Sequence, residues 1–263
     1  MRDGHIHSPY CPHGSTDSFE EYINKAIQLG LSEITFTEHL PLPSNFKDPS
    51  PKQDSGMNEN FIMDYFDELT FLKEKYKNKI KINIGVEVDF IEGYEKEVKE
   101  KLDKYGKYLD DAILSVHMLK INDEYYCIDF SVEEFEKVIN LLGNIENVYN
   151  KYYQTLKLAI NSNLGKYKPT RIGHLNLVRK YNQKFPFDYS NNKNLEEVVK
   201  LLKEKNYEVD FNISGLRKPY CKEPYINGHL LKLIKKYNIK FVLGSDSHSS
   251  KDIESIKGFN ENL

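Results

Sequence analysis

Histidines and acidic residues follow the ends of several short apolar runs in this sequence. His5 and His7 end the first such run, and Asp246 and His248 follow the run at 241–243 with the same i, i+2 spacing. Residues two apart on a strand share one face, so each pair can present two ligand groups to one ion. Imidazole and carboxylate ligands suit Zn, Mn or Fe better than Mg or Ca. The pattern therefore predicts a site for a transition metal.

Other histidines and one glutamate occupy the same place relative to further apolar runs. These residues are His39, Glu87, His117 and His174. A carboxylate has two oxygens and can bridge two cations, so we expect Glu87 to lie between ions. His13, in the loop after the first run, is a further candidate ligand, whereas His229 lies in a helical pattern with no strand before it and is interpreted as structural. We therefore predict a polynuclear metal centre.

The elements that must position these residues alternate along the whole chain. Strands are predicted at 2–6, 32–36, 80–88, 111–116, 170–173, 208–213 and 240–243, and helices at 18–29, 59–77, 93–107, 131–161, 194–205 and 228–237. Such alternation is typical of a parallel sheet with covering helices. Without a second compositional zone, it predicts one α/β domain over residues 1–263, built as a closed or nearly closed barrel. Barrels place their active sites at the carboxyl ends of the strands.

Two segments between these elements are predicted to be long loops. Residues 41–58 hold four prolines and a glycine, and residues 119–130 are polar and aromatic. Long loops in a compact domain often form lids or binding walls, and a tolerated surface insertion is the alternative.

Composition limits the class of partner and the compartment. The 263 residues include 37 Lys and Arg against 40 Asp and Glu, a net charge of −3, so no broad basic surface for nucleic acid is expected. Neither a signal-peptide pattern nor a run of 18 apolar residues is found, so no membrane span is predicted. Cys11, Cys127 and Cys221 lack Cys-x-x-Cys spacing, which favours free thiols in a reducing cytoplasm and no metal role. The oligomeric state is not predicted.

The motifs that carry these residues, in this order, resemble those of the PHP (polymerase and histidinol phosphatase) superfamily. They are His5-Ile6-His7, Thr37-Glu38-His39, Gly85-Val86-Glu87, Ser115-Val116-His117, Gly173-His174 and Ser245-Asp246-Ser247-His248. Flanking segments at 38–43, 115–119, 127–129 and 214–219 are similar to the histidinol-phosphate phosphatase branch. This resemblance implies a distorted (β/α)7 TIM-like barrel with three divalent metal ions.

The resemblance also implies how the ligands are shared among the ions. The first ion would take His5, His7, Glu87 and Asp246, the second Glu87, His117 and His174, and the third His13, His39 and His248. It further implies arginines that bind phosphate, which Arg171 and Arg217 match best. They are two of only four arginines among 37 basic residues, and a planar guanidinium suits two phosphoryl oxygens.

The activity implied by the resemblance is hydrolysis of L-histidinol phosphate to L-histidinol and phosphate, a step of histidine biosynthesis. Two ions about 3.5–4 Å apart can hold a bridging water and lower its pKa, so the expected attack on phosphorus is by a metal-bridging hydroxide. Besides Glu87, the expected catalytic residues are Asp246 and His248, either of which can relay a proton to the leaving alkoxide. Tyr125, Tyr126 and Asp129 are candidates for stacking on histidinol and balancing its charge.

Three alternatives stay open at this point. A phosphoesterase of the same superfamily acting on nucleotides or oligonucleotide ends is disfavoured by the missing basic surface. A metal amidohydrolase also has an early His-x-His and a late Asp, but commonly bridges its ions with Lys, where this chain has Glu87. A metal-binding or regulatory module without turnover is disfavoured because no ligand motif is missing.

Overall fold

Seven parallel strands form the centre of the structure, a computed structural model that describes residues 1–259. Their order in the sheet is β1-β2-β3-β4-β7-β8-β9. These strands are Arg2–Ile6 (β1), Glu33–His39 (β2), Lys81–Asp89 (β3), Asp111–Ser115 (β4), Arg171–Ile172 (β7), Glu208–Asn212 (β8) and Phe241–Gly244 (β9). All seven predicted strands are therefore confirmed, with ends that shift by up to three residues.

Contacts between the first and last strands nearly close the sheet into a barrel. A parallel bridge joins Ile6 to Ser247, the His7 N–H donates to the Ser247 carbonyl at 2.9 Å, and the Asp246 N–H donates to the His5 carbonyl at 2.8 Å. The two-residue β7 and an irregular register in β1 distort the barrel. The predicted seven-stranded α/β barrel is thus confirmed, and its closure brings both ends of the chain to one site.

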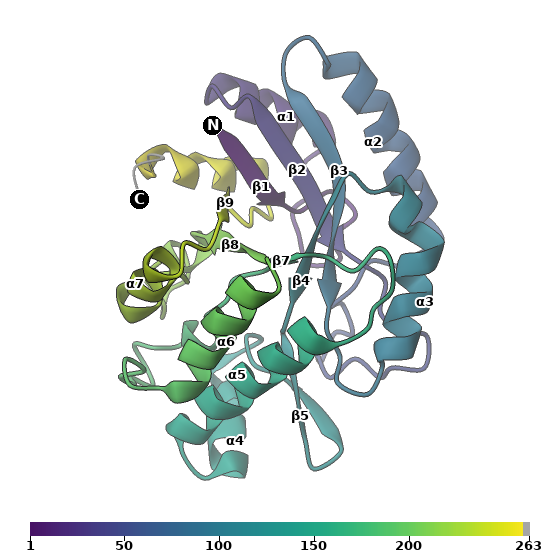
Figure 1. Cartoon of the computed structure of the whole chain (residues 1–263). Coiled ribbons are helices and arrows are strands. Elements are labelled where there is room, and N and C mark those ends of the chain that lie inside the picture. Colours follow the sequence, from purple (N-terminus) through teal and green to yellow (C-terminus); the bar gives the residue numbers. More distant parts are fainter. Residues whose placement is uncertain (260–263) are drawn as a thin grey trace.

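Helices lie outside the curved sheet, and each buries an apolar face in the hydrophobic core (Figure 1). They are Phe19–Gln28 (α1), Ile62–Tyr76 (α2), Glu95–Tyr105 (α3), Val132–Leu142 (α4), Ile145–Asn161 (α5), Lys193–Glu204 (α6) and Gly228–Lys236 (α7). A capping box begins α1, because the Ser18 side chain accepts from the Glu21 N–H and the Glu21 side chain accepts from the Ser18 N–H. No helix among residues 1–259 is long and apolar enough to cross a membrane.

The helix predicted over 131–161 is two helices, α4 and α5. Gly143 adopts a left-handed conformation with φ of +87°, which ends α4, and the Asn144 side chain accepts from the Asn147 N–H to begin α5. Gly at such a position has no Cβ to oppose the turn. Apolar periodicity continues across this break, which is why the sequence pattern did not reveal it.

The segment predicted as a loop at 119–130 contains a β-hairpin instead. Met118–Ile121 (β5) pairs with Glu124–Cys127 (β6) in an antiparallel ladder. Asn122 and Asp123 connect the strands with φ of 49° and 63°, and two positive φ angles are typical of a type I′ hairpin turn. The hairpin follows β4 directly, so it extends the wall of the barrel at the carboxyl edge (Figure 1).

Candidate metal centre and active site

The nine residues predicted to bind metal lie around one cavity at the carboxyl edge of the barrel. This cavity has a volume of about 350 Å³, which is within the usual range for a small-molecule site. Eight of the nine line its surface, together with three lysines: His7, His13, His39, Glu87, His117, His174, Asp246 and His248, with Lys52, Lys180 and Lys218. His5 lies just below, fully buried. The expected position of the site is therefore what the structure shows.

A first group of ligand atoms surrounds one oxygen of Glu87. The Nε2 atoms of His5 and His7 lie 3.4 and 3.5 Å from Glu87 Oε2, and His7 Nε2 lies 3.3 Å from Asp246 Oδ1. All four side chains are nearly buried. The i, i+2 spacing of the two histidines thus places both rings on the inner face of the barrel, as expected for β1.

A second group surrounds the other oxygen of the same carboxylate. His174 Nε2 lies 3.0 Å from Glu87 Oε1 and 3.0 Å from His117 Nε2. His117 Nε2 is 3.7 Å from Glu87 Oε1. Each oxygen of Glu87 thus faces a different histidine group, which is the placement that a carboxylate bridging two ions would need.

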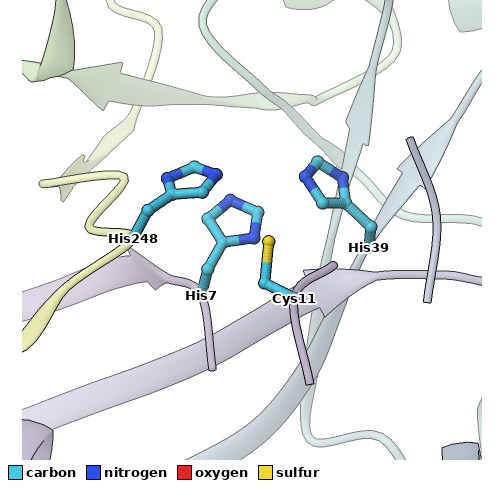
Figure 2. A group of neighbouring side chains, drawn as sticks. All are labelled: His7, Cys11, His39 and His248. Carbon is cyan, nitrogen blue, oxygen red and sulfur yellow. The ribbon is translucent and has the colours of Figure 1, made fainter. Parts of the chain in front are cut away.

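A third group lies at the mouth of the cavity. The Nε2 atoms of His13 and His248 face each other at 3.2 Å, and His13 is held through Nδ1 by the Asp54 carbonyl at 2.9 Å. The ligand atoms of His7, Cys11, His39 and His248 all lie within 4.8 Å of one another (Figure 2). The Cys11 thiol, to which the sequence assigned no metal role, is thus part of this neighbourhood.

Buried carboxylates orient the histidines of the first two groups. His5 Nδ1 bonds to Asp210 at 2.7 Å, and His117 Nδ1 bonds to Asp89 at 2.6 Å. His7 Nδ1 is 3.3 Å from Glu38. An Nδ1–H that donates to a carboxylate leaves the Nε2 lone pair free for an ion, the usual arrangement around metal-bound histidine.

The remaining ring nitrogens support the same interpretation. Within residues 1–259, Nε2 of His5, Nε2 of His7 and both ring nitrogens of His39 are buried without a hydrogen-bond partner. Buried polar atoms are nearly always satisfied, so inward-facing atoms without partners mark the place of a bound group. Imidazole and carboxylate donors at these distances fit divalent transition-metal ions.

The buried charges of the cluster shift one another's protonation. Burial raises the pKa of the Glu87 carboxyl, but the imidazoles of His5 and His117 outweigh burial and hold this pKa well below its usual range. Burial lowers the pKa of His117, but the Asp89 and Glu87 carboxylates outweigh it and raise this pKa to about 10. Burial and a neighbouring imidazole lower the pKa of His39 to about 3. The raised pKa keeps a proton on the His117 imidazole, so an ion bound there should displace this proton.

Asp246 is held in an uncommon backbone conformation. Its φ is +51°, and its Oδ2 accepts from Ser214 Oγ at 2.9 Å and from Asn212 Nδ2 at 3.2 Å. Strand β9, which precedes Asp246, lies very close to the side chains of Asp210 and His5. A Cβ on Gly244 would lie 2.1 Å from Asp210 Oδ1 and 2.7 Å from His5 Cβ. These contacts leave Oδ1 directed at the histidines.

The structure does not place the predicted phosphate-binding arginines in the cavity wall. Arg171 is buried at the start of β7, where its guanidinium donates to Asp111 at 2.8 Å and to the Gly4 carbonyl at 3.0 Å. Arg217 donates to the carbonyls of Ser245 and Asp246 at 2.9 and 3.0 Å and to Ser255 Oγ at 2.7 Å. Arg171 thus joins strands, and Arg217 supports the loop that carries Asp246.

Three lysines that the sequence analysis did not name as candidates line the cavity instead: Lys52 in the loop at 41–58, Lys180 and Lys218. Lys180 is 2.9 Å from Asp129, and this carboxylate outweighs burial and raises the pKa of Lys180. Lys218 has no carboxylate within ion-pair distance in the described part of the chain, and burial and the charge of Lys180 lower its pKa. Lys218 lies in the segment at 214–219 that resembles the histidinol-phosphate phosphatase branch, whereas nothing in the sequence distinguishes Lys180 among the 33 lysines.

The aromatic residues expected to stack on a substrate are used elsewhere. Tyr125 packs against Phe46 and donates to the Glu92 carbonyl at 2.7 Å, and Tyr126 donates to Glu124 at 2.6 Å. Neither ring lines the cavity, because the hairpin directs both rings toward residues beside it. Asp129 does line it, next to Phe130.

The loop at 41–58 contributes a wall of the cavity through Ser50, Lys52, Asp54 and Ser55. Asp48 shapes it by accepting from the N–H groups of Ser50 and Ser55 at 2.8 and 2.9 Å. The segment is therefore a binding wall and not a surface insertion. His229 lies in the first turn of α7, outside the cavity, in agreement with its structural interpretation.

Comparisons with known proteins agree with the resemblance drawn from the motifs. The model of the PHP domain family matches residues 3–214. The chain is 43% identical to the histidinol-phosphatase of Bacillus subtilis, over 96% of this chain and 95% of that protein. It is 30% identical to the histidinol-phosphatase of Lactococcus lactis, over 95% of this chain and 84% of that protein.

Solved structures show the same architecture. A protein of Listeria monocytogenes has a TM-score of 0.91 at 36% identity, over 96% of this chain and 97% of that one. The histidinol phosphate phosphatase of Lactococcus lactis, complexed with zinc, L-histidinol and phosphate, has a TM-score of 0.74 at 26% identity, over 98% of this chain and 91% of that one. The chain therefore belongs to the PHP domain family and, within it, to the branch of the histidinol-phosphatases.

Proposed function

We propose that this chain is a metal-dependent phosphatase that hydrolyses L-histidinol phosphate to L-histidinol and phosphate. The observation that carries the proposal is the cluster itself, in which inward-facing imidazole nitrogens surround both oxygens of one buried glutamate. A relative with the same architecture holds zinc, L-histidinol and phosphate. The cavity volume of about 350 Å³ suits a substrate of this size.

Three divalent ions, including zinc, are part of this proposal. The first would be held by His5, His7, Glu87 and Asp246, the second by Glu87, His117 and His174, and the third by His13, His39 and His248. When bound, such ions polarise phosphoryl oxygens and lower the pKa of water, which supplies a nucleophile near neutral pH. Asp210, Asp89 and Glu38 fix the histidine rings for this role.

We assign binding of the phosphoryl group to Lys218 and Lys180 in place of the two arginines. Both ammonium groups line the cavity, and Lys218 has no competing carboxylate partner among residues 1–259. A desolvated ammonium next to a phosphate dianion forms a strong, charge-assisted hydrogen bond. Arg217 acts indirectly, because it holds the carbonyls of Ser245 and Asp246 in place.

The leaving alcohol needs a proton and a place to bind. Asp246 and His248 line the cavity 3.5 Å apart, and they are our candidates for moving this proton. Asp129 is neutralised by Lys180, so Asp54 in the opposite wall is the better partner for the substrate ammonium. Phe130, with an exposed side chain at the rim, offers a surface for the imidazole.

The test is phosphate release from a panel of histidinol phosphate, nucleoside monophosphates and p-nitrophenyl phosphate. We expect the highest kcat/KM for histidinol phosphate, and equal rates across the panel would contradict the substrate assignment. Lys218→Ala should lower kcat/KM about 10–100-fold, since a charged hydrogen bond contributes ~1.5–3 kcal/mol. The matched control, Lys184→Ala on the exposed surface, should keep wild-type kinetics.

A further inference from the structure

The loop after β1 brings a thiol to the third ligand group. Cys11 is buried, with 6% of its surface exposed, and its Sγ lies within 4.8 Å of ligand atoms of His7, His39 and His248. Figure 2 shows the sulfur on the same side as these imidazole rings, directed toward them. The cysteine carries no disulfide.

The backbone around Cys11 fixes the thiol in this place. The Cys11 N–H donates to the Ser8 carbonyl at 3.0 Å, and the Gly14 N–H donates to the Cys11 carbonyl at 3.2 Å. The Ser15 N–H donates to the His248 carbonyl at 2.8 Å, which ties the loop to the segment of another ligand. A Cβ on Gly14 would lie 3.0 Å from Cys11 Cβ, closer than ordinary van der Waals contact, so the glycine lets the loop pack closely here.

The imidazoles of the third group lack a fourth ligand from the sequence motifs. His13 Nε2 and His248 Nε2 face each other at 3.2 Å, and both ring nitrogens of His39 are buried without a hydrogen-bond partner in residues 1–259. His7 Nε2 is directed at Glu87 and belongs to the first group. Zinc takes four ligands in a tetrahedron, with roughly 3.4–3.7 Å between neighbouring N and S atoms. The ligand atoms of Cys11, His39 and His248 lie within 4.8 Å of one another, and His13 Nε2 lies 3.2 Å from His248 Nε2, so a modest contraction suffices.

We propose that Cys11 is a direct thiolate ligand of the ion that His13, His39 and His248 hold. This inference rests on the proposed function, because it deepens the third metal site of that proposal. A thiolate with three imidazoles is a softer ligand set than the carboxylate-containing groups around Glu87. The third position therefore selects zinc, whereas the first two accept Zn, Mn or Fe.

Cobalt(II) is the probe for the metal–sulfur bond. The protein is stripped of metal and loaded with cobalt, and its absorption spectrum is compared with that of Cys11→Ser, with cobalt content measured on each sample. We expect a near-ultraviolet cobalt–thiolate charge-transfer band in the wild type, none in Cys11→Ser, and an unchanged band in the control Cys221→Ser, another buried free cysteine outside the cavity. A fully loaded wild type without the band, or a band that Cys11→Ser retains, overturns the proposal.

A second measurement needs no variant, so it remains valid if Cys11→Ser fails to fold. The wild type is alkylated with iodoacetamide with and without zinc, and each cysteine is followed by peptide mass mapping. Zinc should slow labelling of Cys11 at least about 10-fold, since a coordinated thiolate is a poor nucleophile, and leave Cys221 unchanged. Equal labelling of Cys11 in both states contradicts coordination.

Turnover of histidinol phosphate by the same wild-type samples separates the two proposals. If the band and the protection appear without turnover, the thiolate ligand stands and the proposed function fails. If turnover is found without the band or the protection, the function stands and the thiolate ligand fails.

Discussion

The two ends of the barrel both hold charged side chains, but these side chains are paired differently at each end. At the amino edge, Arg2 and Arg171 share the Asp111 carboxylate, and Arg2 also pairs with Glu33 at 3.2 Å. Asn83 donates to Glu33 at 2.7 Å and to Thr35 at 3.2 Å, so each of these side chains finds at least one partner within the protein, although Arg171 Nε has no hydrogen-bond partner among residues 1–259.

At the carboxyl edge, the donors and acceptors converge without satisfying one another. Imidazole nitrogens of His5, His7 and His39 face inward with no hydrogen-bond partner among residues 1–259. Their outward nitrogens, where paired, bond to carboxylates such as Asp210. The difference teaches that burial and charge alone do not mark a functional site. A cluster whose polar atoms remain unsatisfied toward a common point does.

The largest effect is expected at the residue shared by two ligand groups. Glu87→Gln keeps the shape of the side chain and removes the negative charge that lies between the histidine groups. We expect kcat/KM to fall by at least about 100-fold, with fewer ions bound, because ligand charge holds the cations. Activity assays measure kcat/KM, and elemental analysis measures the bound ions. A variant with wild-type metal content and turnover would show that Glu87 does not hold the ions.

A smaller effect is expected from a carboxylate that contacts no ion. Asp210 holds His5 Nδ1 at 2.7 Å, so Asp210→Asn weakens the orientation of one ligand. Loss of such a partner typically costs 10–100-fold in metal affinity, and we expect that range in zinc titrations. Added zinc should restore much of the activity, and no rescue would show that Asp210 has another role.

At the amino edge, the prediction concerns stability and not turnover. Arg171→Met leaves Asp111 paired with Arg2 alone, so we expect a loss of about 2 kcal/mol, somewhat below the ~3–5 kcal/mol for a buried charge left unpaired. Tm should fall by about 4–8 °C. The folded variant should keep wild-type kcat/KM for histidinol phosphate. A 10-fold loss of kcat/KM at unchanged metal content would show that Arg171 contributes to substrate binding.

The smallest effect is expected at the histidine outside both edges. His229 lies in the first turn of α7, away from the cavity, so His229→Gln should leave kcat/KM within a few-fold of the wild type. Steady-state kinetics beside His117→Asn, which should lose most activity, provide the contrast. Equal losses of activity in the two variants would mean that a position just after a strand does not distinguish the functional histidines.

The barrel and its ligand positions were predictable because both depend on local patterns. Apolar periods mark the strands, and a residue just after a parallel strand must lie at the carboxyl edge. His39, His117 and His174 follow that rule. The orienting carboxylates were within reach as well, because Asp89 lies two residues after Glu87 on one strand face.

The two arginines predicted to bind phosphate lie outside the cavity lining, for a geometric reason. Arg171 precedes His174 by only three residues, but each strand residue advances about 3.3 Å, so Arg171 belongs to the opposite edge of the short β7. Lys180 and Lys218 lie in irregular segments that follow strands, and the sequence does not predict the path of these segments. Scarcity of arginine indicated special positions, but it did not indicate which end of the barrel they serve.

The most direct test of the account is a zinc titration of the metal-free protein, with histidinol phosphate hydrolysis and bound zinc measured at each addition. We predict negligible turnover without metal, recovery as the first ions bind around Glu87, and saturation close to three zinc ions per chain. Turnover that persists in the metal-free protein, or full activity with no bound zinc, would contradict the claim that the unsatisfied cluster is a catalytic metal centre.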